Sequence, residues 1–139
     1  MKVVFHSRSS EQYIGEWGCE KSSKLAQKGY MVKAKYGIPC SRLKGRIEDV
    51  DIHCTSEEEA MALAAGAYLA GEEPVVYMQN SGLCRCLDII LSLYKPYEIP
   101  LPKMILSVRH RPHHHHFAGK ATQQLLDLVG YEDVEVVEQ

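Results

Sequence analysis

Three short apolar runs, separated by segments long enough for helices, limit what this chain can fold into. The runs are residues 74–78, 104–108 and 134–137. The first two have the length and apolar content of strands buried on both faces, and strands that alternate with helices form parallel sheets. The pattern therefore predicts an α/β fold, a doubly wound, mostly parallel sheet with helices on both faces.

Two alternating segments add strands ahead of these runs. Apolar and charged residues alternate over 31–36 and over 50–54, which is the period of a strand with one buried face. Helices are expected between the strands, and no linker, repeat or change of composition divides the chain, so residues 1–139 should form one domain. The expected helices cover residues 14–28, 41–48, 56–71, 87–94 and 118–129.

The helix over 56–71 has the clearest start and the clearest buried face. Ser56 and Glu59 have the spacing of a capping box, in which the two residues satisfy each other's backbone N–H groups. Its expected buried positions recur at the helical period. They are Ala60, Leu63, Ala64 and Ala67.

Composition excludes several classes of protein. With 139 residues, 45% apolar and 24% charged, the chain can bury its own core and is neither a disordered tail, a collagen-like rod nor a disulfide-stapled miniprotein. A net charge of −2 provides no general attraction for nucleic acid or for an anionic membrane. The five cysteines include no C-x-x-C pair, and no signal peptide or membrane-length apolar run is present. We therefore expect reduced thiols in a cytoplasmic protein.

Ligands of open parallel sheets bind beyond the carboxyl ends of the strands, and three polar loops are expected there: 54–59, 79–82 and 109–116. The residues alone leave simpler interpretations open. Carboxylates in a first helical turn often only compensate the helix dipole, and 79–82 could be a plain turn in which Ser81 caps the next helix. No P-loop, nucleophile elbow or dinucleotide fingerprint is present.

Two further clusters have ordinary explanations. Adjacent histidines converge poorly on one ion, so residues 113–116 favour a mobile loop over a metal site. Cys84 and Cys86 fall on different sides of a helix, which favours buried, inert thiols over a shared ligand role.

Longer strings carry a more specific signal. They are EEEAMALAAGAYLAG (57–71), VVYMQNSGL (75–83), SLYK (92–95) and YEIP (97–100). Together they resemble the thiamine-diphosphate-dependent sulfopyruvate decarboxylases and the related phosphonopyruvate decarboxylases, above all the alpha subunit of the two-subunit sulfopyruvate enzyme. The resemblance runs from about position 24 to about position 131. It implies a pyrimidine-binding domain, a hetero-oligomer in which a beta subunit binds the diphosphate, and Mg²⁺ held by that partner.

The resemblance also implies roles for individual residues. Glu57 matches the glutamate that bonds N1′ of the aminopyrimidine and favours the imino tautomer, which accepts the proton from C2. The loop beside the cofactor corresponds to Gln79, Asn80, Ser81 and Gly82, and the missing side chain at Gly82 would let the backbone come close.

Two basic residues are candidates for the dianionic substrate. Arg109 follows a strand where the family has an Arg-Gly pair, and a guanidinium there suits the sulfonate or carboxylate, although a solvated loop cation is equally open. His115 matches a histidine of the phosphonopyruvate branch. Departures from the family are Cys84 and Arg85, where Gly and Asn are expected, and His110, where Gly is expected.

The activity implied is decarboxylation of 3-sulfopyruvate, a 2-keto acid, to sulfoacetaldehyde and CO₂ in coenzyme M biosynthesis. Phosphonopyruvate decarboxylase is the alternative, because sulfonate and phosphonate differ mainly by one charge and a proton. A non-catalytic paralogue that binds a partner or a metal through Cys84 and residues 113–116 is a third interpretation. Glu57 argues against it, because a chain released from catalysis has no need of that side chain.

Overall fold

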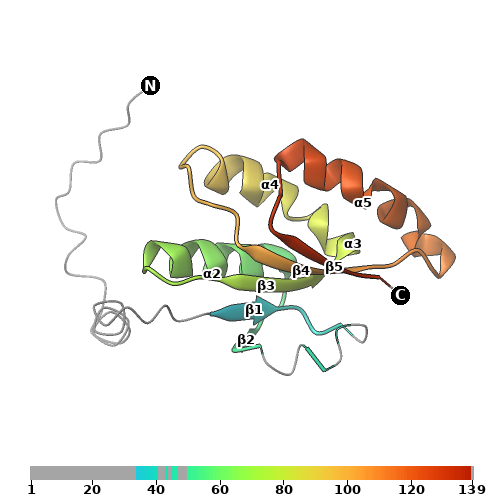
Figure 1. Ribbon diagram of the computed structural model, residues 1–139, viewed down its shortest axis with the longest axis horizontal. Helices are drawn as coiled ribbons and strands as arrows, with labels where there is room; N and C mark the ends of the chain where they lie inside the picture. Colours follow the sequence, from blue (N-terminus) through green and yellow to red (C-terminus); the bar gives the residue numbers. More distant parts are fainter. Residues whose placement is uncertain (1–33, 41–42, 44, 47–49, 139) are drawn as a thin grey trace.

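The structure is a computed structural model that describes residues 34–40, 43, 45–46 and 50–138. The helix expected over 14–28, most of that expected over 41–48 and the first residues of the strand expected over 31–36 lie outside the described residues. A five-stranded parallel sheet in the order β2-β1-β3-β4-β5 confirms the predicted α/β fold (Figure 1). The strands are β1 (Lys35–Gly37), β2 (Ile52–His53), β3 (Val75–Gln79), β4 (Lys103–Val108) and β5 (Val134–Glu138).

The helices agree with the prediction in place but differ from it in detail. Residues 80–83 form a helical turn instead of a plain loop, and the helix expected over 87–94 changes to a π-helix half-way. The loop expected for the histidine run is instead a 3-10 turn that leads directly into the last helix, two residues earlier than expected. The elements are α2 (Glu57–Leu69), α3 (Asn80–Leu83), α4 (Leu87–Ile89), the π-helix η4 (Ile90–Tyr94), the 3-10 helix η5 (His113–His115) and α5 (His116–Val129).

Ser56 caps helix α2 as predicted, and its hydroxyl accepts a hydrogen bond from the Glu59 N–H at 3.2 Å. The Glu59 carboxylate reaches back one residue further and accepts from the N–H and the hydroxyl of Thr55, both at 2.7 Å. Leu63 is exposed, contrary to the prediction, and Met61 is buried in its place. The buried face consists of Ala60, Met61, Ala64, Ala65 and Ala67.

The helices of the described chain pack on one face of the sheet (Figure 1). Their side chains form one core with the strand residues that point the same way, and the Tyr94 hydroxyl donates to the Met61 carbonyl at 2.6 Å to join η4 to α2. The strand residues in this core include Val76, Met78, Met104 and Leu106.

The opposite face is reached by the connection between β1 and β2. Leu43 lies in that connection and is buried against Val75 and Ile105, which point away from the helices. This arrangement follows from right-handed crossovers, because β1 to β2 runs across the sheet in the opposite direction to the later connections. The chain therefore leaves β1 and β3 toward opposite faces, which places the switch point of the fold between these two neighbouring strands.

Candidate active site

The carboxyl ends of β1, β3 and β4 bring four polar side chains together at this switch point. The Cys40 thiol, three residues beyond β1, donates to Gln79 Oε1 at 3.5 Å and accepts from Arg109 Nη2 at 3.5 Å. Gln79 Nε2 lies 3.4 Å from His115 Nδ1. Burial lowers the pKa of His115, and the nearby His114 and Arg109 lower it further. Gln79 of one predicted loop and Arg109 and His115 of another thus belong to one cluster.

Cys40 was not predicted as a site residue, although it lies in a loop that follows a strand. The signal was present in its position, because residues directly after β1 must border the crevice at a switch point. That signal could be used only once the strand order was known, and the order depends on tertiary pairing.

The amide of Asn80 holds this edge of the sheet together. It is buried, and its Oδ1 accepts from the Arg109 N–H at 3.2 Å while its Nδ2 donates to Thr122 Oγ1 at 3.1 Å and to the Arg109 carbonyl at 3.5 Å. Thr122 in turn donates to the Ala118 carbonyl at 2.7 Å. Asn80 thereby fixes the backbone of Arg109 against α5 and positions the end of β4.

Replacing Asn80 with Ala should lower the free energy of unfolding by about 2–3 kcal/mol, because buried partners of the amide lose their hydrogen bonds. Urea or guanidinium unfolding of the full chain measures this change. Ser81→Ala is the matched control, since this neighbouring residue is exposed; its effect should stay within about 0.5 kcal/mol. Equal stability of the two variants would contradict the positioning role of Asn80.

Ser81 does not cap a helix. It lies inside α3, whose N-cap is Gln79 and has no side-chain capping bond. Its exposed hydroxyl accepts from Gln79 Nε2 at 2.8 Å, so Ser81 and His115 both contact the amide nitrogen of Gln79. The alternative of a plain capped turn, left open by the sequence, therefore does not describe residues 79–82.

Glu57 is the first residue of α2 and lies against the other end of α3. Its side chain is 13% exposed, and a Cβ atom on Gly82 would overlap it. The missing side chain at Gly82 therefore leaves room for the Glu57 side chain, while the expected approach of the backbone to the cofactor stays a prediction. The two carboxylates that follow Glu57 in the same turn are also at the positive end of the helix dipole.

Arg85, a departure from the family, reaches both Glu57 and Glu58. Its Nη1 lies 3.7 Å from Glu57 Oε2 and its Nε lies 3.4 Å from Glu58 Oε1, while its own side chain is 62% exposed. The Glu58 backbone N–H and the Arg85 guanidinium lower the pKa of the Glu58 carboxyl. Because Arg85 is largely in water, each pair contributes little to stability, and the guanidinium can move away from Glu57 at small cost.

The cysteine prediction is right for one thiol and wrong for the other. Cys86 is buried in the core, and burial, with the nearby carboxylates of Glu57 and Glu58, raises its pKa to about 12. Cys84 is exposed. The four cysteines within the described ranges are free thiols. In the same part of the chain, no group of three or more His, Cys, Asp or Glu side chains could hold a metal ion.

Comparison with known proteins identifies relatives of this chain. The chain is 42% identical over 81 residues to "Sulfopyruvate decarboxylase subunit alpha" of Methanocaldococcus jannaschii, which covers 53% of this chain and 46% of that protein. A subunit of the same name from Methanothermobacter thermautotrophicus is 40% identical over 79 residues, 52% of this chain and 47% of that protein. "Phosphonopyruvate decarboxylase" of Streptomyces viridochromogenes is 37% identical over 116 residues, 75% of this chain and 29% of that protein.

The chain is related to the sulfopyruvate and phosphonopyruvate decarboxylases. The resemblance stated from the sequence strings is thereby confirmed. The chain spans less than half of the length of these relatives, and no family model matches it. No helix among the described residues is long and apolar enough to cross a membrane.

Proposed function

We propose that this chain is the alpha subunit of a cytoplasmic, thiamine-diphosphate-dependent decarboxylase that converts 3-sulfopyruvate to sulfoacetaldehyde and CO₂ for coenzyme M biosynthesis. The observation that carries the proposal is the position of Glu57, largely buried at the start of α2 and packed against Gly82. The identity of 38–42% to three proteins named sulfopyruvate decarboxylase subunit alpha supports the choice of substrate.

The residues around Glu57 fit the pyrimidine half of the cofactor. Its carboxyl group packs against Gly82 of α3, and it can exchange a proton with a ring nitrogen such as N1′. When bound, thiamine diphosphate supplies the electron sink for decarboxylation. The share of this chain is to hold a proton at N1′ through Glu57, to orient the ring and to exclude water with the buried Leu83 and Cys86 behind it.

The cluster around Arg109 fits the anionic end of the substrate. Arg109 and His115 face the same crevice as Gln79, so a guanidinium, an imidazole and an amide can all donate hydrogen bonds there. Asn80 holds the Arg109 backbone from behind, which limits the freedom of the guanidinium. We assign the sulfonate of 3-sulfopyruvate to Arg109 and a supporting contact to His115.

A partner subunit completes the site in this proposal. Diphosphate requires Mg²⁺ and oxygen ligands, and the described ranges contain no carboxylate group arranged to hold a metal. A diphosphate-binding beta subunit would supply them, in a hetero-oligomer whose active site lies between the two chains. The word "alpha" in the names of the relatives supports a second subunit.

Co-expression with a candidate diphosphate-binding subunit tests the proposal. The purified pair, given thiamine diphosphate and Mg²⁺, should release CO₂ from 3-sulfopyruvate, and neither subunit alone should do so. The lone chain should bind thiamine diphosphate weakly by calorimetry, because the contacts made by the diphosphate-binding subunit are missing. Tight binding of thiamine diphosphate by the lone chain would contradict the proposal. A pair of subunits that leaves both 3-sulfopyruvate and 3-phosphonopyruvate unchanged would also contradict it.

Phosphonopyruvate is the second candidate substrate. The observation that favours it is the match to a phosphonopyruvate decarboxylase over 75% of this chain, a larger share than the 53% matched by a sulfopyruvate alpha subunit. The same assay separates the two, since the better substrate has the higher kcat/KM. A higher value for 3-phosphonopyruvate would transfer the assignment of Arg109 and His115 from a sulfonate to a phosphonate.

A further inference from the structure

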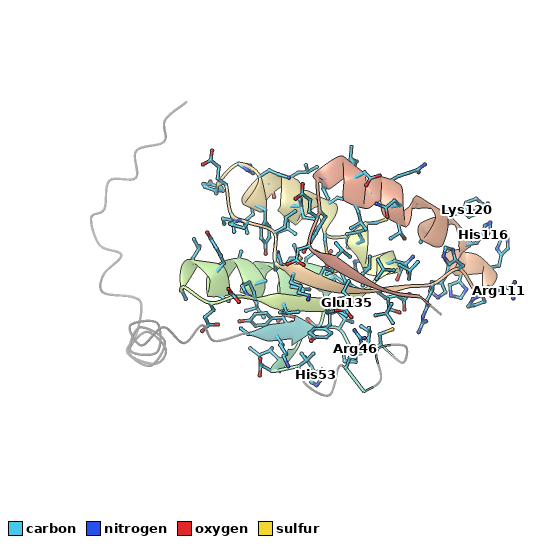
Figure 2. All side chains as sticks on the ribbon, in the orientation of Figure 1. Arg46, His53, Arg111, His116, Lys120 and Glu135 are labelled. Carbon is cyan, nitrogen blue, oxygen red and sulfur yellow. The ribbon has the colours of Figure 1, made fainter. Side chains whose placement is uncertain are left out.

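A cavity lies beside the loop that follows β4. It has a volume of about 430 Å³ and is lined by His110, Arg111, His113 and His116. None of these four residues is part of the site assigned above. Figure 2 shows Arg111 and His116 at the same end of the molecule, with Lys120 of α5 beside them.

The chain segment that contributes the lining of this cavity is basic. The sequence contains no Asp or Glu from position 99 to position 126, while it contains Arg109, Arg111, Lys103, Lys120 and five histidines there. Arg111 is exposed and makes no hydrogen bond or ion pair with any residue that the structure describes. Its guanidinium therefore retains all five N–H donors for a ligand.

The backbone beside the cavity favours the same sign of charge. Helix α5 begins at His116 with no acidic residue in its first turn and no side-chain capping bond, in contrast to α2. The side chains of its own first turn thus do not compensate the positive end of its dipole. His113 and His116 are one turn apart, with ring centroids 6.4 Å apart and an interplanar angle of 15°, so both rings border one small space.

We propose that this cavity is a binding site for a tetrahedral oxyanion, the group shared by phosphates, phosphonates and sulfonates. Arg111 contributes a bidentate pair of donors, and His110, His113 and His116 contribute ring N–H groups. A metal ion is disfavoured, because a guanidinium would repel it and no three ligands converge among the described side chains. The proposal does not depend on the decarboxylase assignment, since the two sites use different residues.

Binding can be measured by NMR on the full chain labelled with ¹⁵N, at a pH of about 6, where ordinary imidazoles are largely protonated. Inorganic phosphate, methylphosphonate and methanesulfonate are the probes. We expect saturable shifts of the ring signals of His113 and His116. Binding of phosphate and methylphosphonate alone identifies a phosphoryl-type ligand, and binding of all three extends the class to sulfonates; both results support the site.

Charge and geometry can be separated with variants. Arg111→Gln should weaken binding about fivefold, the loss of one largely exposed charge-assisted contact. Lys95→Gln is the matched control, because it also removes one positive charge. Lys95 lies near Gly130, at the opposite end of α5 from the cavity, so its replacement should leave the affinity unchanged.

Three results would overturn the site. The first is the absence of saturable shifts with any of the three anions. The second is an equal loss of affinity in Arg111→Gln and Lys95→Gln, which would show attraction by net charge alone. The third is a response of these rings to Zn²⁺ and to none of the anions, which would replace the anion site by a metal site.

Discussion

Glu57→Gln should abolish turnover of 3-sulfopyruvate by the assembled decarboxylase, with a loss in kcat of about 10²–10⁴-fold, the usual contribution of acid–base catalysis. Glutamine has nearly the shape of glutamate and keeps the packing against Gly82. It cannot exchange a proton with N1′ of the cofactor. Steady-state CO₂ release by the co-purified subunits measures the effect, and size-exclusion chromatography should show unchanged assembly.

Glu58→Gln is the matched control for this experiment. Glu58 lies in the same helical turn and also contacts Arg85, but its side chain is 39% exposed against 13% for Glu57. Its replacement removes the same charge without touching the space beside Gly82, so turnover should remain within a few-fold of the wild type. Near-normal turnover of Glu57→Gln, or equal losses in both variants, would refute the assignment of Glu57.

Gly82→Ala should cause the second large loss, on the order of 10²-fold in kcat, because the new methyl group occupies the space of the Glu57 side chain and displaces it. The same CO₂ assay measures the loss. Gly66→Ala is the matched control, since a Cβ at that position in α2 meets no atom within 4 Å. It should keep full activity and raise the free energy of unfolding by roughly 0.5–1 kcal/mol through helix propensity.

A double variant shows whether Gly82→Ala acts through Glu57. The clash with Glu57 should also lower the thermal unfolding midpoint of Gly82→Ala. If the methyl group clashes only with that side chain, adding Glu57→Ala should restore the midpoint. Both single variants and the double variant can be compared by thermal unfolding. A double variant that remains as unstable as Gly82→Ala would mean that the methyl group disturbs other parts of α3, and the loss of turnover would then say nothing about Glu57.

The elements predicted most accurately were those whose burial or capping can be recognised from consecutive residues in the sequence. Strands β3 and β4 are buried and therefore appear as apolar runs, and α2 was found to within two residues because Ser56 caps it. Helix α3 was missed because its residues are polar and one turn of helix has no period to detect. The π-helix η4 was missed because tertiary contacts such as that of Tyr94 with Met61 hold it in place.

The candidate site was likewise predicted only in part. The resemblance to a known family pointed to Glu57, Gln79, Arg109 and His115, and the structure brings the last three into one cluster. The contact of Cys40 with that cluster and the approach of Arg85 to Glu57 could not be predicted. Each contact joins segments that are far apart in the sequence, and their distance in space depends on the tertiary fold.

Every strand that the structure describes runs parallel to its neighbours, so no β-hairpin among these strands can start the assembly of the sheet. Lys35 pairs with Val75 and Met104 with Val134, and each pairing has to wait for at least one intervening crossover to form. Loop-closure entropy makes such distant pairings slow. During synthesis on the ribosome, β1 can pair with β2 first but must wait for β3 to emerge before its other edge is covered, and Tyr36 stays open to chaperones in that interval.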